Sequence, residues 1–407
     1  MNRFVSMVAA LAIAAFLNGC GSKASSADAP PDFKAVGGDS SVTITWTAAP
    51  DVEYWIFYAR GSNVTSTNWL SIGGAAISKV TSPHTVGGLV NGTTYSFTMN
   101  GRKNGGPGGT GAPTQVLTPR LAGANWVVNA PLGSARLNGA GATSTTRTAV
   151  GAGGVIYSLP VGGTVATQTN PSAPAALNAV LNGGLGFAAV GNAGTVIFTS
   201  DTLTWTTKTS NTVADLYALA SPATGAFTAY GAAGTVISSA DGSTWTTGIS
   251  GTTKNLYGAI YGGARYVAVG AEGTIITSTD GMTWQTVATA TARDLRTVTF
   301  GALVNITGTT TTTTNQFVAL GTAGTLLTSA DGLTWTLQPP ISTSTINAAV
   351  YGGQFVAVGT NGAIYTSADG VAWQSQVSGT TSELTAIART ATGYIVVGAA
   401  GTYLTSQ

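Results

Sequence analysis

The chain has 407 residues, of which only 7% are charged and 56 are glycine, and its formal net charge is +2. An average soluble protein carries about 25% charged residues, so small, turn-forming and β-favouring residues replace the usual charged surface here. The small positive charge forms no basic stripe, which excludes an electrostatic surface for nucleic acid or anionic lipid.

Residues 1–19 form a predicted signal peptide rather than part of a folded domain. Arg3 precedes an apolar run of 14 residues, positions 4–17, which has the length of a signal-peptide core and is too short to span a bilayer comfortably. The Leu-Asn-Gly-Cys that follows at residues 17–20 resembles the lipobox of bacterial lipoproteins. That resemblance implies a lipidated Cys20 and, because Gly21 follows it, sorting to the outer membrane. An ordinary secretory signal with a chance cysteine is the alternative.

Cys20 is the only cysteine in the chain, so the sequence predicts no disulfide, no thiol catalysis and no cysteine–metal site. Residues 20–31 are small, polar and proline-terminated, and we expect the lipidated residue to be followed by a flexible tether. The only histidine, His84, is interpreted as a plain surface residue, since one imidazole cannot build a metal site. We therefore expect no metal and no cofactor.

Residues 32–119 are predicted to form a β-sandwich domain. Residues 42–46 (VTITW) alternate as a half-buried strand, and residues 54–58 (YWIFY) form the next strand. Trp46 and the Leu-x-Asn-Gly-Thr-x-Tyr-x-Phe segment at 89–97 resemble a fibronectin type III domain, with Tyr95 as the tyrosine-corner residue. This resemblance implies a spacer or a protein-binding module.

A Gly-x-x-Gly turn recurs seven times within residues 121–407, at steps of 40, 40, 39, 51, 38 and 39 residues. Each copy lies between short apolar runs. A period near 40 with four short strands per unit predicts a β-propeller, one four-stranded blade per repeat. The chain is therefore expected to be all-β. The turns begin at Gly151, Gly191, Gly231, Gly270, Gly321, Gly359 and Gly398.

The two ends of this repeat region complement each other. The last repeat stops at Gln407 without the Trp-bearing fourth strand, whereas residues 124–128 supply an unassigned strand with Trp126. We predict that this strand completes the seventh blade and closes the ring, which removes exposed sheet edges. Trp126 would then join the blade-core residues Trp205, Trp245, Trp284, Trp335 and Trp373.

The step of 51 residues contains an insertion, Gly301 to Gln316, in which residues 309–314 are all threonine. Six β-branched residues between two apolar strands favour an extended hairpin that stands off the ring. A low-complexity loop is the alternative.

Four repeats carry Ser-x-Asp-Gly-x-x-Trp, and a fifth has a partial copy at residues 200–205. These segments resemble Asp-boxes, although they are one residue shorter than the usual pattern. The resemblance implies the sialidase-like superfamily and the Ycf48-type repeats of photosystem II assembly factors. Because aspartate in such a turn accepts backbone N–H bonds and Trp packs between blades, we interpret the copies as structural. The aspartates are Asp201, Asp241, Asp280, Asp331 and Asp369.

The predicted propeller offers little material for catalysis. Residues 121–407 contain no histidine or cysteine, which excludes Ser–His and Cys–His chemistry and the usual zinc sites. A sialidase-like enzyme would need, by family resemblance, an arginine triad and a Tyr/Glu pair, and the Phe-Arg-Ile-Pro-type segment is missing. We therefore predict that the protein is not an enzyme and has no catalytic residues.

The remaining charged residues are predicted to gather on the loops at one mouth of the channel, the usual ligand face of a propeller. In so uncharged a chain, this clustering suggests a rim that binds a polar partner; the alternative is that loops merely tolerate charge. The candidate ligand-binding residues are Arg136, Asp215, Lys254, Glu272, Arg293, Asp294, Arg296 and Glu383.

Three functions follow from this organisation. The first is a non-catalytic, lipid-anchored scaffold of the cell envelope that binds an envelope or extracellular protein, facing the periplasm or the exterior. The second is a cell-surface glycan-binding or adhesive protein, and the third, which fits the composition least, is a sialidase-like glycosidase. All three contact the membrane only through the lipid anchor, and none binds nucleic acid.

Overall fold

The computed structural model describes residues 24–161, 163–169, 175–307 and 310–406. The predicted signal peptide and Cys20 lie outside these residues. The chain divides into two units, residues 1–36 with 41–118 and residues 37–40 with 119–407, and each is described by itself. No helix in the described part of the chain is long and apolar enough to cross a membrane.

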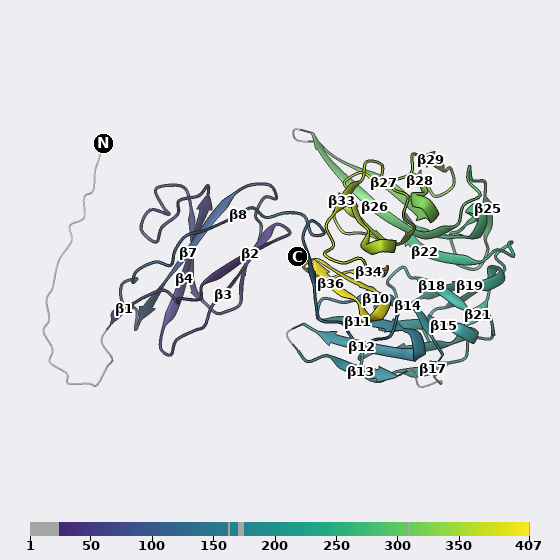
Figure 1. The fold of residues 1–407 in the computed structure, drawn as a ribbon, viewed down its shortest axis with the longest axis horizontal. Helices are drawn as coiled ribbons and strands as arrows, with labels where there is room; N and C mark the ends of the chain where they lie inside the picture. The colour runs from purple at the N-terminus through teal and green to yellow at the C-terminus, as the bar shows by residue number, and fades with distance from the viewer. Residues whose placement is uncertain (1–23, 162, 170–174, 308–309, 407) are drawn as a thin grey trace, which may run out of the picture. The chain divides into compact units, whose positions relative to one another are not determined.

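The first unit contains two antiparallel sheets (Figure 1). The three-stranded sheet runs in the order β2 (Lys34–Gly38), β3 (Ser41–Thr45), β6 (His84–Val86). The five-stranded sheet runs β1-β7-β4-β5 with β8 also on β7, and its strands are β1 (Ser25–Ala27), β4 (Glu53–Arg60), β5 (Ala75–Val80), β7 (Tyr95–Lys103) and β8 (Gln115–Leu117).

One prediction for this unit is wrong over part of its length. Residues 20–31 were expected to be a flexible tether, yet Ser25–Ala27 pair with Gly101–Lys103 of β7. The backbone of these small residues satisfies its hydrogen bonds on a sheet edge, which their polar composition did not indicate.

The core of the first unit follows the predicted alternation. Trp46 and Tyr54 are buried with ring centroids 5.6 Å apart in an edge-to-face arrangement. The Oη atom of the buried Tyr95 accepts a hydrogen bond from the Val90 N–H at 3.2 Å. A tyrosine hydroxyl bonded to the backbone a few residues upstream is the arrangement expected at a tyrosine corner.

The second unit consists, among its described residues, of seven four-stranded antiparallel sheets, numbered here in chain order. Fourth strands such as β17, β21 and β25 lie at the periphery in Figure 1. Sheet 1 comprises β10 (Leu137–Ala142), β11 (Thr146–Gly151), β12 (Val155–Pro160) and β13 (Ala166–Thr169); sheet 2, β14 (Leu177–Asn182), β15 (Phe187–Gly191), β16 (Val196–Thr199) and β17 (Thr206–Lys208); sheet 3, β18 (Leu216–Ala220), β19 (Phe227–Gly231), β20 (Val236–Ser239) and β21 (Thr246–Thr247).

The remaining sheets repeat this order. Sheet 4 comprises β22 (Leu256–Gly262), β23 (Arg265–Gly270), β24 (Ile275–Ser278) and β25 (Gln285–Val287); sheet 5, β26 (Leu295–Thr307), β27 (Thr310–Gly321), β28 (Leu326–Ser329) and β29 (Thr336–Gln338); sheet 6, β30 (Ile346–Tyr351), β31 (Phe355–Gly359), β32 (Ile364–Ser367) and β33 (Gln374–Gln376); sheet 7, β34 (Leu384–Arg389), β35 (Tyr394–Gly398), β36 (Tyr403–Ser406) and β9 (Trp126–Val128).

The fourth strand of sheet 7 comes from the start of the unit. Strand β9 pairs with β36, with Trp126 opposite Ser406 and Val128 opposite Leu404, which is the pairing predicted from the two ends of the repeat region. The first strands of consecutive sheets pack against one another, and β34 of sheet 7 packs against β10 of sheet 1.

Each Gly-x-x-Gly segment forms a short 3-10 turn between the second and third strands. In sheet 2, a Cβ on Gly191 would overlap the Ala176 carbonyl oxygen, and one on Gly194, which has φ +68°, would overlap the Thr212 carbonyl oxygen. Glycine is therefore needed at both positions for the loops to pack. The turns are η1 (Ala152–Gly154), η2 (Asn192–Gly194), η3 (Ala232–Gly234), η4 (Ala271–Gly273), η5 (Thr322–Gly324), η6 (Thr360–Gly362) and η7 (Ala399–Gly401).

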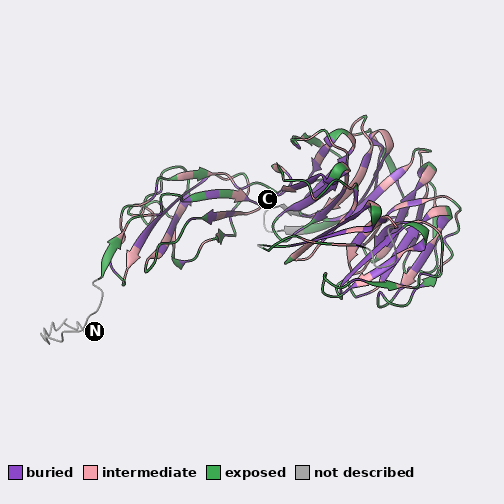
Figure 2. Ribbon diagram, turned by 60° about the horizontal axis from the view of Figure 1, so that its bottom comes forward, coloured by how far each residue is buried: buried purple, intermediate pink, exposed green. Residues whose placement is uncertain are grey.

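Apolar clusters fill the space between neighbouring sheets, and exposed residues concentrate in the loops and outer strands (Figure 2). Between sheets 3 and 4, the fully buried Tyr230 meets Trp284 edge-to-face at 5.4 Å. Trp245 is also almost fully buried, and its indole N–H donates to the Gly242 carbonyl at 3.2 Å. These contacts support the assignment of the repeated tryptophans to the cores.

The five Asp-box aspartates act as predicted, as turn-stabilising residues. The Asp280 Oδ1 atom accepts the N–H groups of Met282 and Thr283, both at 2.8 Å, and the Ser278 hydroxyl at 2.8 Å. These bonds to the charged form lower the pKa of Asp280 to about 2. In the same way, the Oδ1 atom accepts the backbone N–H groups two and three residues further on in Asp201, Asp241, Asp331 and Asp369.

The insertion in sheet 5 is a long hairpin, so of the two interpretations of this segment the extended hairpin is confirmed and the low-complexity loop is wrong. Strands β26 and β27 remain paired from Leu295 opposite Gly321 to Thr307 opposite Thr310. Residues 308–309, between them, lie outside the described part. The pair continues well beyond the third strand of the sheet, since β28 pairs only with Phe317–Leu320.

Candidate functional site

A β-bulge interrupts the first strand of every sheet in the second unit. In each case the register shifts after the first residue, so one extra residue is inserted opposite the second strand. A bulge of this kind redirects a side chain and increases the local twist. The inserted residues, called here the bulge residues, are Asn138, Asn178, Tyr217, Tyr257, Arg296, Asn347 and Thr385.

The bulge residues line one cavity together with the rest of the first strands. The cavity has a volume of about 420 Å³ and receives residues from all seven sheets. Because the first strands occupy equivalent places in the repeat, their bulge residues share one end of the cavity, called here the mouth. Most of the remaining wall is alanine, glycine and aliphatic side chains.

Four bulge residues connect neighbouring sheets. The side chain of each donates a hydrogen bond to the backbone carbonyl at the start of the next first strand, where it satisfies an acceptor that the bulge displaces. The bonds run from Asn138 to Leu177 at 3.0 Å, from Asn178 to Leu216 at 2.9 Å, from Asn347 to Leu384 at 2.8 Å and from Thr385 to Leu137 at 2.5 Å.

The other three bulge residues, on sheets 3, 4 and 5, form a different arrangement. The rings of Tyr217 and Tyr257 lie 5.8 Å apart, and the Arg296 guanidinium carbon lies 4.4 Å from the Tyr257 ring centroid. All three side chains are half-buried. We call this set the Tyr–Tyr–Arg arc; it makes the mouth asymmetric.

Charge and burial shape the arc. Arg296 Nη2 pairs with Asp294 Oδ2 at 3.1 Å, while its buried Nε atom has no hydrogen-bond partner among the described residues. Burial raises the pKa of Tyr217, with the charges of Asp215 and Tyr257 adding to the shift. The Tyr217 hydroxyl therefore stays protonated at neutral pH.

The predicted rim residues are mostly engaged with one another. Arg136 Nη1 contacts Glu383 Oε2 at 2.6 Å, and Lys254 Nζ contacts Glu272 Oε2 at 2.6 Å. With the Arg296–Asp294 pair, six of the eight are placed in three ion pairs. Arg293 Nη1 lies 3.5 Å from the Ala323 carbonyl oxygen.

Two rim carboxylates also stabilise the turn of the preceding sheet. Asp215 Oδ1 accepts the N–H of Ala193 at 2.8 Å, and Asp294 Oδ1 accepts the N–H of Glu272 at 3.1 Å. The turn residue that donates its N–H has positive φ in both cases, 51° for Ala193 and 53° for Glu272. Of the eight predicted residues, Arg296 is the one that lines the cavity.

Tyr217 and Tyr257 are not among the predicted site residues, although the sequence contains a signal for them. In every repeat, one aliphatic residue at the start of the first strand is followed by Asn, Tyr, Arg or Thr. Simple alternation does not show that this second residue is inserted by a bulge, so it was not singled out.

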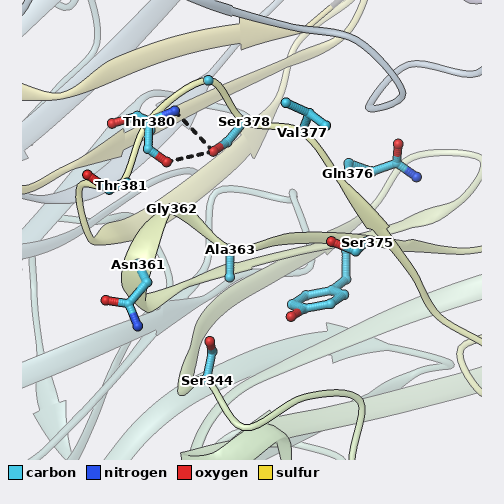
Figure 3. A pocket seen from close by; sticks show the side chains of 12 residues that line it. Ser344, Asn361, Gly362, Ala363, Ser375, Gln376, Val377, Ser378, Thr380 and Thr381 are labelled. Carbon is cyan, nitrogen blue, oxygen red and sulfur yellow. Dashed lines mark hydrogen bonds between the residues drawn. The ribbon is translucent and has the colours of Figure 1, made fainter.

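A second hollow lies beside the loop that precedes sheet 7 (Figure 3). It measures about 780 Å³, and the Ser378 hydroxyl in its wall donates to the Thr380 carbonyl at 3.0 Å. The loop before sheet 4 has the same geometry, with Ser250 donating to Thr252 at 3.1 Å beside a hollow of about 560 Å³. A feature that recurs from sheet to sheet is structural equipment rather than a specific site.

No group of three or more potential metal ligands (His, Cys, Asp or Glu) occurs among the described residues. The described residues that line the mouth and its cavity carry no carboxylate, imidazole or thiol. The arrangement offers aromatic faces, the guanidinium groups of Arg296 and Arg389 and small apolar side chains, which suit binding.

Comparisons with known proteins place this fold. The family described as the DUF6242 beta propeller domain matches residues 162–295. The chain has no match among curated proteins. Three solved structures are similar in fold: "YCF48 bound to D1 peptide" (17% identity, TM-score 0.54, covering 69% of this chain and 94% of that one), the WD40 beta propeller domain of Doa1 (11%, 0.53, 70% and 96%), and virginiamycin B lyase from Staphylococcus aureus (10%, 0.58, 70% and 99%). The protein is thus all-β and contains a β-propeller domain with Ycf48-like structural neighbours.

Proposed function

We propose that this protein is a non-catalytic binding protein that holds a protein partner at the mouth of its propeller. The Tyr–Tyr–Arg arc carries this proposal. Tyrosine and arginine are the residues that most often dominate protein interfaces, because each combines a large apolar surface with hydrogen-bonding groups. Here three consecutive sheets present them together at the mouth of a cavity.

Exposed apolar residues on the loops between sheets favour a protein over a polysaccharide. Val213 and Ile249, on the loops that precede sheets 3 and 4, are 88% and 83% exposed. Aliphatic side chains of this kind gain by burial against apolar protein surface. The structural neighbour described as YCF48 bound to D1 peptide has the same fold and holds a peptide, which agrees with this choice.

We also propose the architecture around this site. The seven sheets are taken as one seven-bladed ring, supported by the β9–β36 pairing and by the packing of β34 on β10. The first unit is taken as a fibronectin type III spacer, supported by its sheet order and its Tyr95 contact. The lipobox-like residues 17–20 support lipidation of Cys20 and an outer-membrane location, periplasmic or surface-exposed.

The test compares two double variants in the full chain. Tyr257→Ala with Arg296→Ala removes two members of the arc, whereas Tyr261→Ala with Arg265→Ala removes the same residue types at the other end of sheet 4. Cross-linking in the source cells identifies the partner, and its affinity for each purified variant is then measured. We expect at least a tenfold loss for the arc variant and little change for the control.

Two results would contradict the proposal. If both variants bind the purified partner as tightly as the native chain does, the mouth is not the binding site. If cross-linking recovers polysaccharide and no protein, and the arc variant loses binding on a glycan array, the protein is the glycan binder of the second hypothesis.

A further inference from the structure

We infer that the cavity behind the Tyr–Tyr–Arg arc receives an apolar side chain from an extended segment of the partner protein. This inference rests on the proposed function and specifies what the mouth recognises. It separates the site into two parts, an arc that contacts the backbone of the segment and an interior that selects one of its side chains.

Small apolar side chains make up much of the interior wall. Ala140, Ala259 and Ala349 line it from sheets 1, 4 and 6. The Thr297 hydroxyl accepts the Ala349 N–H at 3.1 Å, and the other polar and charged lining residues lie near the ends of the first strands. A volume of about 420 Å³ lies within the usual range of binding pockets, roughly 300–1,000 Å³, which are also mostly apolar with a few polar groups.

Close approach of the first strands creates this interior. A Cβ on Gly139 would lie 2.9 Å from the Ala179 Cα atom, and one on Gly258 would lie 2.7 Å from the Arg296 carbonyl oxygen. The two glycines thus let neighbouring sheets pack backbone to backbone, so alanines rather than large side chains line the cavity. Space is left in the middle as a result.

The mouth favours a backbone rather than a second charged group. Asp294 accepts one hydrogen bond from Arg296 and offsets its charge, and the Arg296 Nε atom has no hydrogen-bond partner among the described residues. Four carbonyls at the mouth already accept Asn or Thr side chains. Peptide carbonyls of an extended segment match the remaining donors, and Tyr217 and Tyr257 supply flat surfaces for its apolar atoms.

The probe is a displayed library of random dodecapeptides, selected on the full chain carrying Cys20→Ser. Selected peptides should share a Leu, Ile, Met or Phe, and replacing that residue by alanine should weaken binding at least tenfold. Filling the cavity with Ala140→Leu or Ala349→Leu should weaken binding by at least the same factor, although neither residue belongs to the arc. Melting curves establish that each variant is folded.

Protection of a cysteine from alkylation provides a second measurement, which does not need the larger leucine side chains of the previous variants. Cys20 is the only cysteine, so Ala140→Cys in the Cys20→Ser background gives a single thiol in the cavity. Saturating peptide should slow its alkylation at least fivefold. Leu337→Cys, on the outer strand β29 and 46% exposed, is the matched control and should react at the same rate with and without peptide.

The outcomes distinguish the two proposals. Peptides that lose affinity in the Tyr257→Ala/Arg296→Ala variant, tolerate Ala140→Leu and leave the cavity thiol reactive would overturn this inference and keep the proposed function. Peptides insensitive to both changes, or a library that yields no binder, would contradict both.

Discussion

Arg136 and Glu383, which are 247 residues apart in the chain, join the first and seventh sheets through two hydrogen bonds, Nη1 to Oε2 at 2.6 Å and Nη2 to Oε1 at 3.1 Å. Asn347 of sheet 6 donates to the same carboxylate at 3.1 Å. The hydrogen bond to Arg136 is the main cause that lowers the pKa of Glu383, and the reciprocal bond raises the pKa of Arg136.

Glu383→Gln should therefore destabilise the second unit only modestly. Both side chains are about one-third to one-half exposed, so solvent screens the pair and we expect a loss of about 0.5–1 kcal/mol in the free energy of unfolding. Urea unfolding of the single variants and of Arg136→Gln/Glu383→Gln would measure the coupling. A coupling of zero would show that the pair does not stabilise the join between the sheets.

Acid should weaken the Asp-box turns. Because the folded-state pKa of Asp280 is lowered to about 2, its contribution to stability is complete above the ordinary aspartate value near 4 and is lost as the pH falls towards 2. Thermal unfolding between pH 5 and pH 2 should show a falling midpoint. Asp280→Asn cannot ionise, so its midpoint should depend less on pH; an identical pH profile would refute the linkage.

Trp245→Ala should be strongly destabilising, because the side chain is 1% exposed and fills the space between two sheets. Removing a buried tryptophan costs about 3–5 kcal/mol through lost burial and the cavity that remains. Leu333→Ala, at a position 38% exposed, is the control and should cost under about 1 kcal/mol. Chemical denaturation of both variants would check the difference, and equal losses would argue against the core assignment.

Weakening strand β9 should expose the edge of β36. Val127 pairs with Thr405, so Val127→Pro places a residue without a donor inside the ladder, whereas Val127→Thr keeps the donor. We expect a lower melting temperature and concentration-dependent association for the proline variant alone, since an unpaired strand edge recruits other chains. Light scattering and thermal melts would test this; a monomeric, fully stable proline variant would contradict the role of β9.

Lipidation of Cys20 is tested in cells. Metabolic labelling with an alkyne fatty acid should mark the native chain, and Cys20→Ala should abolish the label and release the protein from the membrane fraction. An unlabelled native chain would instead indicate an ordinary secretory signal.

The sequence predicted the repeat, its strand order and the role of β9. The reason is that Gly-x-x-Gly and Asp-Gly segments form turns of specific backbone geometry, and their positions can be read directly from the sequence. The sequence predicted the residues of the mouth less well. Asp215 and Asp294 were expected to face a ligand, but each also accepts a backbone N–H of the preceding sheet's turn. Such a contact depends on how neighbouring sheets pack, and the spacing of the repeats in the sequence does not predict that packing.

The bulge residues explain the rest of the difference. Alternation along a strand assigns Tyr217 and Tyr257 to a sheet face, whereas the extra residue in each first strand turns them towards the mouth. Only the recurrence of one variable residue after an aliphatic residue hinted at this. The predicted tether failed for a related reason, since Ser25–Ala27 are held by backbone pairing that does not depend on side-chain type.

Because of the seven bulges, the side chains at the mouth are not the side chains that fill the cores between the sheets. Each inserts a residue that lies outside the apolar clusters, so its side chain can change without reshaping a core. Asn and Thr at the bulge hydrogen-bond to the next sheet. Tyr and Arg at the bulge contact one another instead, and in those sheets other residues make the contacts with the next sheet. If the mouth is the binding site that we propose, exchanging one amino acid per sheet, at positions 138, 178, 217, 257, 296, 347 and 385, would change what the propeller binds without altering its cores.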